Sequence, residues 1–406
     1  MAEKPVNRTF AVDRKYLFFL VLAAAITVLS FGFKFNTHYI LPDEDYYLNY
    51  ATYINKYGIE GFSYLFQQYS QDRAYSAYPN PFRIGYILFS ASWLRIFGYS
   101  FLSLAYFSFF CYCLFLIVSF YFIRKYFSED FALLAVILLA FSPLAMAMAR
   151  RAISESAYCL LSTLSLWLFL DYVREDSNPK RIAFFFTYSF TILIKETAVL
   201  LCPFFFLFLV FRKFIQKKQI KIKDFLYSAI FPLATVFALY VILGGIDNTI
   251  RIIGIIINSP KTSIYAITYG GGPWYRYLID YLVLSPATTI LGTGFIFHYL
   301  CLHKKERREE VDYFILFFIY ILLVFNLFTK NVRYVINLDM PLRIFSLFVL
   351  TQISRQISKN NYRLLLAGLV IAIALGDLIN FNYLFLTHEI NDPVSFALLK
   401  AKHIIY

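Results

Sequence analysis

The chain has 406 residues, of which 60% are hydrophobic and only 16% are charged. This composition excludes an ordinary water-soluble protein, in which roughly 45–50% of residues are apolar. The net charge of +13 would suit nucleic-acid binding in a soluble protein, but much of it lies in short segments between apolar runs, which indicates a multi-pass membrane protein and no nucleic-acid partner.

Apolar runs recur along the whole chain, each near the length needed to cross about 30 Å of hydrocarbon. The first run follows a basic segment, and no small-residue cleavage site follows it, so we interpret it as a retained anchor rather than a signal peptide. We predict about eleven spans, at residues 16–36, 101–123, 131–148, 154–172, 182–194, 198–211, 224–243, 278–300, 313–329, 334–352 and 364–386.

One further apolar stretch, residues 83–97, is only about fifteen residues long and carries Trp93 and Arg95. Counting it as a span would reverse the side of every later loop. Treating it as an interfacial helix places the most basic loops in the cytoplasm, as the positive-inside rule requires. The N-terminus is then cytoplasmic, in a protein of the cell (plasma or inner) membrane.

This topology predicts an all-α polytopic protein with one membrane domain, residues 1–406. Two long segments face outside, at 34–100 and 244–277, and a short outer tail covers 387–406. Both long segments are rich in Tyr, Pro and Gly, with short apolar stretches that suit interfacial helices.

Charged residues near the apolar runs collect on the outer side. They fall in five places: Asp43, Glu44 and Asp45; Arg83; Arg150, Arg151 and Glu155; Lys195 and Glu196; Lys330 and Arg333. Charges near hydrocarbon are costly and are usually paired or functional. A structural explanation exists for single cases, such as an i,i+4 ion pair between Arg151 and Glu155, but the gathering of five groups on one side favours a functional site.

Carboxylates and several cations at a membrane surface suit one kind of chemistry. A carboxylate can accept the proton of a hydroxyl acceptor, and Arg or Lys can neutralise a phosphate that leaves with its bonding electrons. A sugar linked to a lipid phosphate needs both. No acid partner is required, in contrast to the two-carboxylate arrangement of glycosidases.

At these residues the sequence resembles the GT-C superfamily, specifically the protein mannosyltransferase and aminoarabinose transferase type, glycosyltransferase families 39 and 83. The motifs matched are, in chain order, DE-x-x-Y at Asp43, Glu44 and Tyr47; AR followed by an acid at Ala149, Arg150 and Glu155; L-x-K before a proline at Leu193, Lys195 and Pro203; and K-x-x-R-Y at Lys330, Arg333 and Tyr334. The resemblance covers most of the chain, including the segment GGPWYRYLIDYLVLSP that ends the second outer loop.

The resemblance implies a GT-C-like fold and an inverting transferase that uses a polyprenyl-phosphate sugar, with Asp43 as the base and Glu44 as an orienting group. The residues that we expect at the donor phosphate are Arg83, Arg150, Lys195, Lys330 and Arg333. Those that we expect to bind substrate are Tyr47, Glu155, Glu196, Trp274, Tyr275 and Arg276. The chain departs from the family pattern in having Asn80-Pro81 where Lys-Pro is common, which passes phosphate contact to Arg83, and in having Asn337 where a proline is usual.

Two other function classes stay open. A transporter would line a path with intramembrane charges, but only Asp339, Arg343 and Asp377 fall well inside the predicted spans, and no internal repeat is visible. A noncatalytic assembly subunit would have little need for Asp43 and Glu44. The sequence does not settle a cofactor requirement: the acidic cluster suits Mg²⁺ or Mn²⁺ bound through oxygens, and no other cofactor is indicated. The sugar and the hydroxyl acceptor (lipid, glycan or protein) are not indicated either.

Overall fold

The computed structural model describes residues 14–33, 42–72, 79–262, 267, 270–301 and 307–388, and no strand occurs in these ranges. The predicted all-α class is therefore confirmed. In chain order the helices, with η for short 3₁₀ or π segments, are α1 (Arg14–Phe33), α2 (Pro42–Tyr57), η1 (Gly58–Glu60), α3 (Gly61–Gln71), α4 (Ile84–Phe97), α5 (Phe101–Tyr126), α6 (Glu129–Ala140), α7 (Pro143–Ala149), α8 (Glu155–Glu175), α9 (Asn178–Ile194), η3 (Glu196–Leu200), α10 (Leu201–Phe214), α11 (Ile222–Phe225), η4 (Leu226–Ile230), α12 (Phe231–Gly244), α13 (Ile246–Thr262), α15 (Arg276–Leu284), α16 (Pro286–Leu300), α17 (Glu309–Phe325), η6 (Val332–Leu338), α18 (Asp339–Ile357), α19 (Tyr362–Phe381) and η7 (Asn382–Thr387).

Within the described ranges, six continuous helical stretches are long and apolar enough to cross a membrane, or seven if the bent pair α6–α7 is one span. The six are Phe101–Tyr126, Glu155–Glu175, Glu196–Phe214, Ile222–Gly244, Val332–Ile357 and Tyr362–Thr387. The predicted number of about eleven is thus not confirmed. The helices α9, α16 and α17 have 17, 15 and 17 residues, which makes each of them short for a complete span.

Two predicted spans are interrupted by a serine followed by a proline. The span at 131–148 is bent by 62° between α6 and α7, where the Ser142 side chain accepts a hydrogen bond from the Ala145 N–H and Pro143 opens the new helix. The span at 278–300 is likewise broken at Ser285, after which Pro286 begins α16. Proline lacks an N–H, so it suits the first turn of a helix and not its interior.

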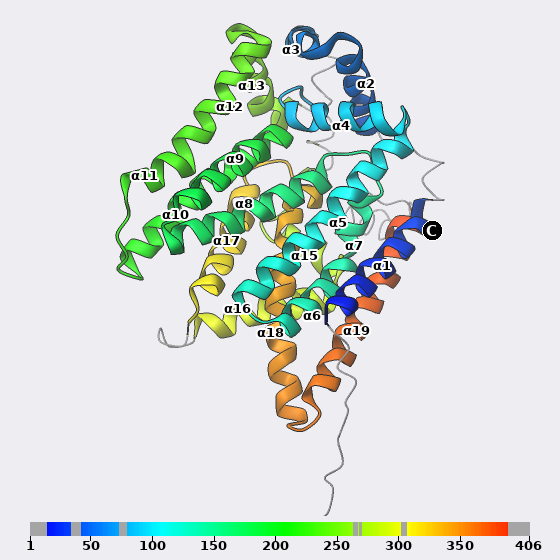
Figure 1. Ribbon diagram of the computed structural model, residues 1–406, viewed down its shortest axis with the longest axis vertical. Coiled ribbons are helices and arrows are strands. Elements are labelled where there is room, and N and C mark those ends of the chain that lie inside the picture. The colour runs from blue at the N-terminus through cyan, green and yellow to red at the C-terminus, as the bar shows by residue number, and fades with distance from the viewer. Residues whose placement is uncertain are drawn as a thin grey trace, which may run out of the picture.

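The helices of the two long predicted outer loops lie together at one end of the molecule. Figure 1 shows α2, α3, α4 and α13 beyond the ends of the longer helices, with the α18–α19 hairpin at the opposite end. The contact between α3 and α12 is close, because a Cβ on Gly244 would lie 1.8 Å from the ring of Phe66. This end layer is therefore firmly packed on the bundle beneath it.

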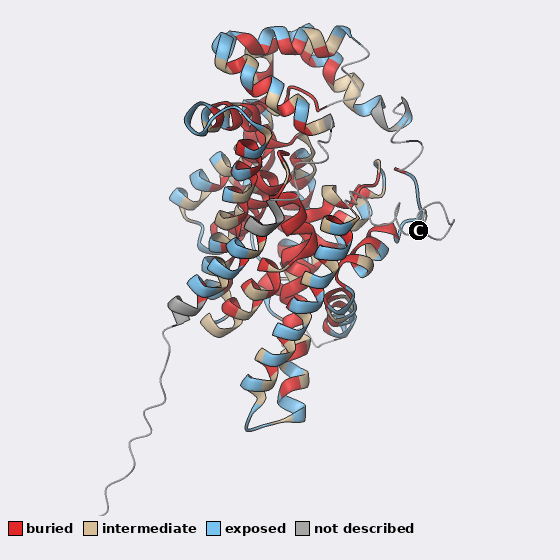
Figure 2. Ribbon diagram, turned by 90° about the vertical axis from the view of Figure 1, so that its right-hand side faces the viewer, coloured by how far each residue is buried: buried red, intermediate tan, exposed pale blue. Residues whose placement is uncertain are grey.

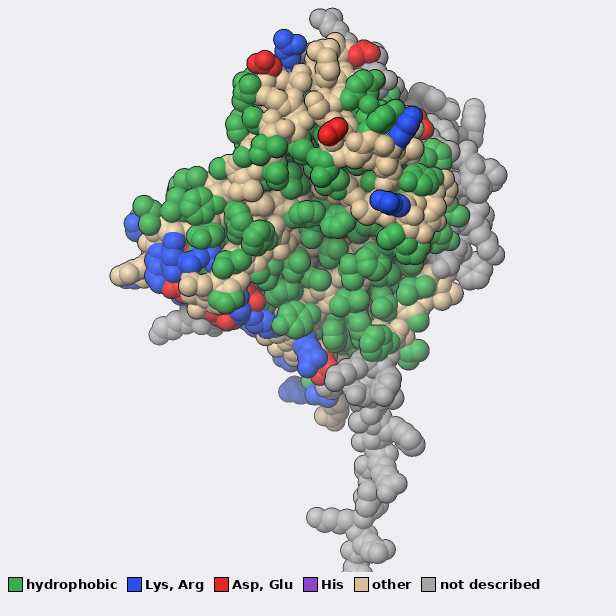
Figure 3. Space-filling model, turned by 45° about the horizontal axis from the view of Figure 1, so that its top comes forward, with side chains coloured by type: hydrophobic (Ala, Val, Ile, Leu, Met, Phe, Trp, Pro, Cys, Tyr) green, Lys and Arg blue, Asp and Glu red, His purple; other side chains and the backbone are tan. Residues whose placement is uncertain are grey.

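The surface of the bundle is apolar, as a membrane protein requires. Buried residues concentrate in the centre (Figure 2), and hydrophobic side chains cover most of the middle of the face in Figure 3, with charged side chains towards its ends. Large side chains such as Ile242, Phe297 and Leu364 are 76%, 73% and 77% exposed. A soluble monomer rarely exposes so much contiguous apolar surface.

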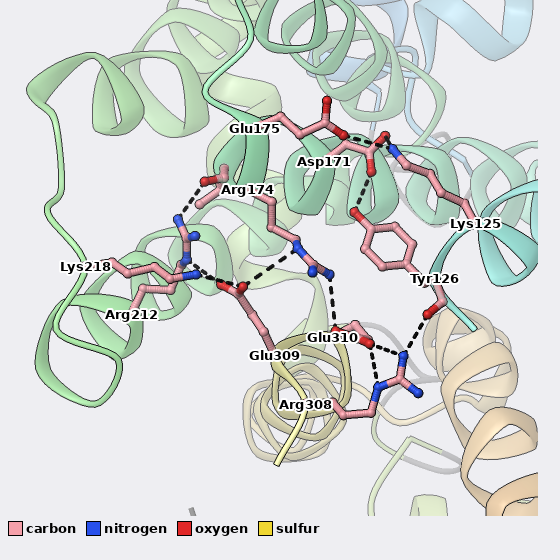
Figure 4. Close-up of polar contacts among 11 residues, drawn as sticks. Lys125, Tyr126, Asp171, Arg174, Glu175, Arg212, Lys218, Arg308, Glu309 and Glu310 are labelled. Atoms are coloured by element: carbon pink, nitrogen blue, oxygen red, sulfur yellow. Dashed lines mark hydrogen bonds and ion pairs between the residues drawn. The ribbon is translucent and has the colours of Figure 1, made fainter. Parts of the chain in front are cut away.

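A network of ion pairs joins the ends of several helices on the side predicted to be cytoplasmic (Figure 4). Glu309, at the start of α17, lies 2.7 Å from Nε of Arg212 and 2.9 Å from Nζ of Lys218. Its neighbour Glu310 lies 3.2 Å from Arg174, near the end of α8. Basic residues counted as cytoplasmic are therefore partly neutralised by carboxylates from another helix.

The three charges predicted to lie inside spans meet in the bundle interior. Arg343 of α18 contacts Asp339 at 3.0 Å and Asp377 of α19 at 2.8 Å, and its Nη2 lies 3.3 Å from the Ser285 hydroxyl. All three charged side chains are almost completely buried. These contacts join α18 and α19 to the turn between α15 and α16, so the three charges have a structural role.

Candidate active site

Four segments that are distant in the sequence bring an ion cluster together. Nη1 of Arg333, in η6, lies 3.2 Å from Oδ2 of Asp43, in the first turn of α2. The same nitrogen lies 3.9 Å from Oε1 of Glu155, the first residue of α8. Nζ of Lys195, between α9 and η3, lies 3.1 Å from that Glu155 oxygen. The predicted base and two predicted phosphate ligands are thus neighbours.

A second ion pair adjoins this cluster. Arg83 holds Glu196 in a two-point contact, with both nitrogen–oxygen distances 2.8 Å. Arg83 also donates a hydrogen bond to the Tyr47 hydroxyl, which lies 3.2 Å from Oγ of Ser154. A fork of this kind fixes the guanidinium plane as well as its charge.

Burial varies across the cluster and decides which part a ligand can reach. The Lys195 side chain is fully buried, whereas Arg333 is 14% and Asp43 is 35% exposed. Burial lowers the pKa of Lys195; the Glu155 carboxylate opposes this shift, and the positive charges of Arg83 and Arg333 add to it. The Asp43–Arg333 edge is therefore the open side, and Lys195 is the enclosed cation behind it.

The start of α2 explains the position of Asp43. A purely structural alternative to catalysis would make Asp43 the cap of a helix that starts at Asp45 or Tyr46, but α2 begins at Pro42. Proline suits the first helical turn, and acidic residues there are stabilised by the helix dipole. Asp43 therefore lies inside the first turn, with its side chain beside Arg333, and is not a helix cap.

Glu44 has different partners from Asp43. Its carboxylate accepts a hydrogen bond from the Ala152 N–H at 2.8 Å and pairs with Arg151 at 3.2 Å. The structural alternative of an i,i+4 pair between Arg151 and Glu155 does not apply, because Arg151 lies in the turn before α8 and the two residues do not share a helical face. Glu44 instead fastens α2 to the α7–α8 turn.

The acidic motif does not converge on a common metal position. Asp43 faces Arg333 and Glu44 faces Arg151, while Asp45 accepts a hydrogen bond from the Asn49 amide at 3.2 Å. In the part of the chain that the structure describes, no three His, Cys, Asp or Glu side chains are grouped as metal ligands. The residues present do not fit the suggested Mg²⁺ or Mn²⁺ site.

Two predicted phosphate ligands have contacts that lead elsewhere. Nη1 of Arg150 donates to the Phe385 carbonyl at 3.2 Å. Lys330 donates its backbone N–H to the Gly270 carbonyl at 2.9 Å and its Nζ to the Gly272 carbonyl at 2.5 Å. These contacts join Arg150 to η7 and Lys330 to the second outer loop.

The three substrate-binding residues predicted in the second outer loop also stay apart from the cluster in the contacts described. Trp274 and Tyr275 are 69% and 44% exposed, and the Trp274 carbonyl accepts a hydrogen bond from Asn326 at 2.8 Å. Arg276 is buried and donates to the Gly271 carbonyl. Its role in the structure is to shape this loop.

Three side chains around the cluster were not predicted as site residues. Ser154 contacts the Tyr47 hydroxyl, and the rings of Tyr158 and Tyr334 lie 5.4 Å and 4.9 Å from Nζ of Lys195. Tyr334 stood within a matched motif, and Ser154 stands beside the motif acid Glu155. Nothing in a single sequence distinguishes Ser154 or Tyr158 from the many Ser and Tyr residues of the apolar runs.

Comparisons with known proteins bear on the family and the fold. Residues 81–243 match the family model of dolichyl-phosphate-mannose-protein mannosyltransferase, and no curated protein matches. The oligosaccharyltransferase of Archaeoglobus fulgidus superposes with a TM-score of 0.60 and 13% identity, over 91% of this chain and 55% of that one. This chain thus spans about half the length of that protein.

A second solved structure is ArnT from Cupriavidus metallidurans bound to undecaprenyl phosphate. It has a TM-score of 0.59 and 12% identity, over 89% of this chain and 75% of that one. At such identities the likeness shows a shared fold. The family model covers less than half of the chain, and the solved structures show that the fold is shared with glycosyltransferases of known structure.

Proposed function

We propose that this protein is an inverting glycosyltransferase that moves a sugar from a polyprenyl-phosphate carrier to a hydroxyl acceptor at the outer face of the membrane. The observation that carries the proposal is the partly exposed Asp43 carboxylate, 3.2 Å from Arg333, with the buried Lys195 behind it. The solved relatives include an archaeal oligosaccharyltransferase in complex with dolichol-phosphate and ArnT bound to undecaprenyl phosphate, which supports a lipid-phosphate donor.

The reaction needs one proton acceptor and a stabilised leaving group. The acceptor oxygen attacks the anomeric carbon while its proton passes to Asp43. The bond between that carbon and the phosphate oxygen breaks, and the oxygen keeps the electron pair. Arg333 and Lys195 stabilise the charge that grows on the phosphate. A single displacement of this kind inverts the anomeric centre.

The charges of the cluster balance before substrate binds. Three carboxylates and three cations face one another: Asp43, Glu155 and Glu196, with Arg83, Lys195 and Arg333. A phosphate that enters at the exposed edge therefore competes with Asp43 for Arg333. That exchange releases the Asp43 carboxylate towards the acceptor hydroxyl and couples donor binding to the readiness of the base.

The length of α8 supports the outer location if the network at its other end is cytoplasmic, as the basic loops predict. Glu155 begins this helix at the ion cluster, and Arg174 lies near its end in the network predicted to be cytoplasmic. A helix of 21 residues is about 30 Å long, close to the thickness of the hydrocarbon layer. The cluster then faces outside in a plasma or inner membrane.

The proposal is tested by mass spectrometry of native membranes with and without the protein. We expect a polyprenyl-phosphate sugar to accumulate without it and a glycosylated lipid, glycan or protein to disappear, and wild-type protein should restore both. Identical lipid-linked sugars and identical glycans in the two membranes would contradict the proposal.

A further inference from the structure

Helix α3 has a buried face and an exposed face of different character. The buried face consists of Gly61, Phe62, Leu65, Phe66 and Tyr69. The other face carries Tyr64, Gln67, Gln68 and Gln71, which are three, four and seven positions apart and so line one side of the helix. Together with Asp72 they line a groove of about 430 Å³.

The groove is unusual in its chemistry for an exposed helix surface. None of the 11 residues of α3 is Lys, Arg, Asp or Glu, although solvent-facing helix surfaces normally carry charged residues. The groove is instead lined by an aromatic ring, three amides and the single carboxylate of Asp72, which follows the helix. A glutamine amide both donates and accepts hydrogen bonds, so this surface can match a ligand whose groups also do both.

The aromatic ring is held in place by neighbours on α2. Tyr64 stacks on Tyr53 with 5.1 Å between ring centres and an angle of 20°, and Tyr53 contacts Tyr57 at 4.4 Å. Tyr64 is still 49% exposed. Part of its ring is therefore presented to the groove in a fixed orientation.

The back of α3 is anchored as firmly. The ring of Phe66 packs so closely on Gly244 that a Cβ at that position would clash with it. Oγ of Ser70 donates a hydrogen bond to Oδ1 of Asn248 on α13 at 2.8 Å. A helix held in this way presents a preformed surface, which reduces the ordering cost of binding.

The same helix also reaches the ion cluster. Tyr69 on its buried face is only 4% exposed. Burial raises the pKa of this phenol, and the nearby charge of Glu196 raises that pKa further, whereas Arg83 lowers it. The groove and the Arg83–Glu196 pair therefore lie on opposite sides of one helix, whose diameter is about 10 Å.

We propose that a neutral oligosaccharide binds in the groove formed by Tyr64, Gln67, Gln68, Gln71 and Asp72. This oligosaccharide is the acceptor glycan, whose hydroxyl receives the transferred sugar. This rests on the proposed glycosyltransferase function. A sugar ring offers a C–H face to an aromatic side chain and hydroxyl groups to amides and a carboxylate. The walls supply no cation for an anionic ligand.

Binding to purified full-length protein tests the proposal, in a detergent without a sugar head group. The probes are linear tetra- to hexasaccharides of glucose, mannose, galactose and N-acetylglucosamine, followed by saturation-transfer NMR. At least one series should bind the wild-type protein. Its affinity should fall at least tenfold in Tyr64→Ala and in Gln68→Ala, and should be unchanged in Tyr64→Trp. The matched control is Gln356→Ala, at an exposed glutamine of α18.

Two results would contradict oligosaccharide binding at the groove: no probe binds, or the affinity is the same in Tyr64→Ala and Gln356→Ala. Oligosaccharide binding should persist in Arg333→Ala, whose substitution removes only the proposed phosphate contact. Transfer activity without oligosaccharide binding removes this inference alone. The opposite outcome is also distinguishable: the groove binds oligosaccharide, but the lipid-linked sugars of the membranes are the same with and without the protein. That result would contradict the proposed transfer reaction and leave a glycan-binding protein.

Discussion

Single residues of the ion cluster differ in how firmly the protein holds them. Arg83 makes a two-point contact with Glu196, and the fully buried Lys195 pairs with Glu155. Arg333 lies at the exposed edge beside Asp43. Arg83 and Arg333 are almost equally exposed, at 13% and 14%, but Arg333 makes the longer contact and lies beside Asp43, so we expect Arg333 to be exchanged more readily to an incoming phosphate.

Replacing Arg333 should impair donor use more than folding. Arg333→Ala removes a charge-assisted contact worth about 1.5–3 kcal/mol, or roughly a 10- to 100-fold loss in kcat/KM for the donor. Arg333→Lys should recover only part of this loss, because an ammonium cannot reproduce a two-point guanidinium contact. Kinetics in reconstituted membranes measure the effect, with the exposed Arg95→Ala as control. Normal donor kinetics in both Arg333 variants would remove this residue from the site.

The pH dependence should report on Lys195. Burial lowers the pKa of Lys195 by more than the paired Glu155 carboxylate raises it, so rising pH removes its proton earlier than from an ordinary lysine, whose pKa is about 10.4. Activity should then fall at a lower alkaline pH than a free lysine would give. Lys195→Arg should move that fall to higher pH, since arginine stays protonated. An unchanged alkaline limb in this variant would contradict the role of Lys195.

At the level of elements, short turns determine where helices begin and end, which the hydropathy of the sequence does not show. Averaged apolarity predicted unbroken spans at 131–148 and 278–300, whereas Ser142–Pro143 and Ser285–Pro286 start new helices there. The turn before α8 likewise separates Arg151 from Glu155 and directs Arg151 to Glu44. An i,i+4 rule holds only within a continuous helix.

The network at the opposite end of α8 should stabilise the bundle. Glu309→Ala leaves the largely buried Arg212 without its 2.7 Å partner. Breaking a fully buried pair costs about 3–5 kcal/mol, and the partial exposure of this one reduces the loss to about 2–3 kcal/mol. We expect a lower melting temperature in detergent. Glu175→Ala, at a carboxylate 47% exposed, should cost under about 1 kcal/mol. Equal melting temperatures for the two variants would show that the network does not brace the helices.

At the level of the whole molecule, sidedness is the most general prediction. Lys217 should lie in the cytoplasm, and Ser70 and Lys261 outside, as should Tyr406, which falls beyond the described residues. Cysteine substitutions at these positions, labelled in intact cells with an impermeant reagent, measure this. The native Cys301 is exposed and predicted to be cytoplasmic, so it serves as an internal control. Labelling of Lys217→Cys from outside would reverse the assigned face of the site.

The sequence predicted the class of protein and several members of the cluster, because composition, charge placement and motif order are local properties. It did not predict the pairings: Arg83 with Glu196, and Arg333 with Asp43, join segments 113 and 290 residues apart. Nor could it tell that Lys330 turns to Gly272, since a loop carbonyl leaves no pattern in the sequence.

The central claim is that Asp43 accepts the proton of the acceptor hydroxyl. The most direct measurement is the rate of sugar transfer by purified Asp43→Asn protein, compared with Asp45→Asn, the same change two residues along α2 at an exposed position. Loss of a general base predicts a fall of roughly 100-fold or more for Asp43→Asn, with donor binding and expression retained. Asp45→Asn should transfer sugar at close to the wild-type rate. Transfer by Asp43→Asn at the wild-type rate would contradict the claim.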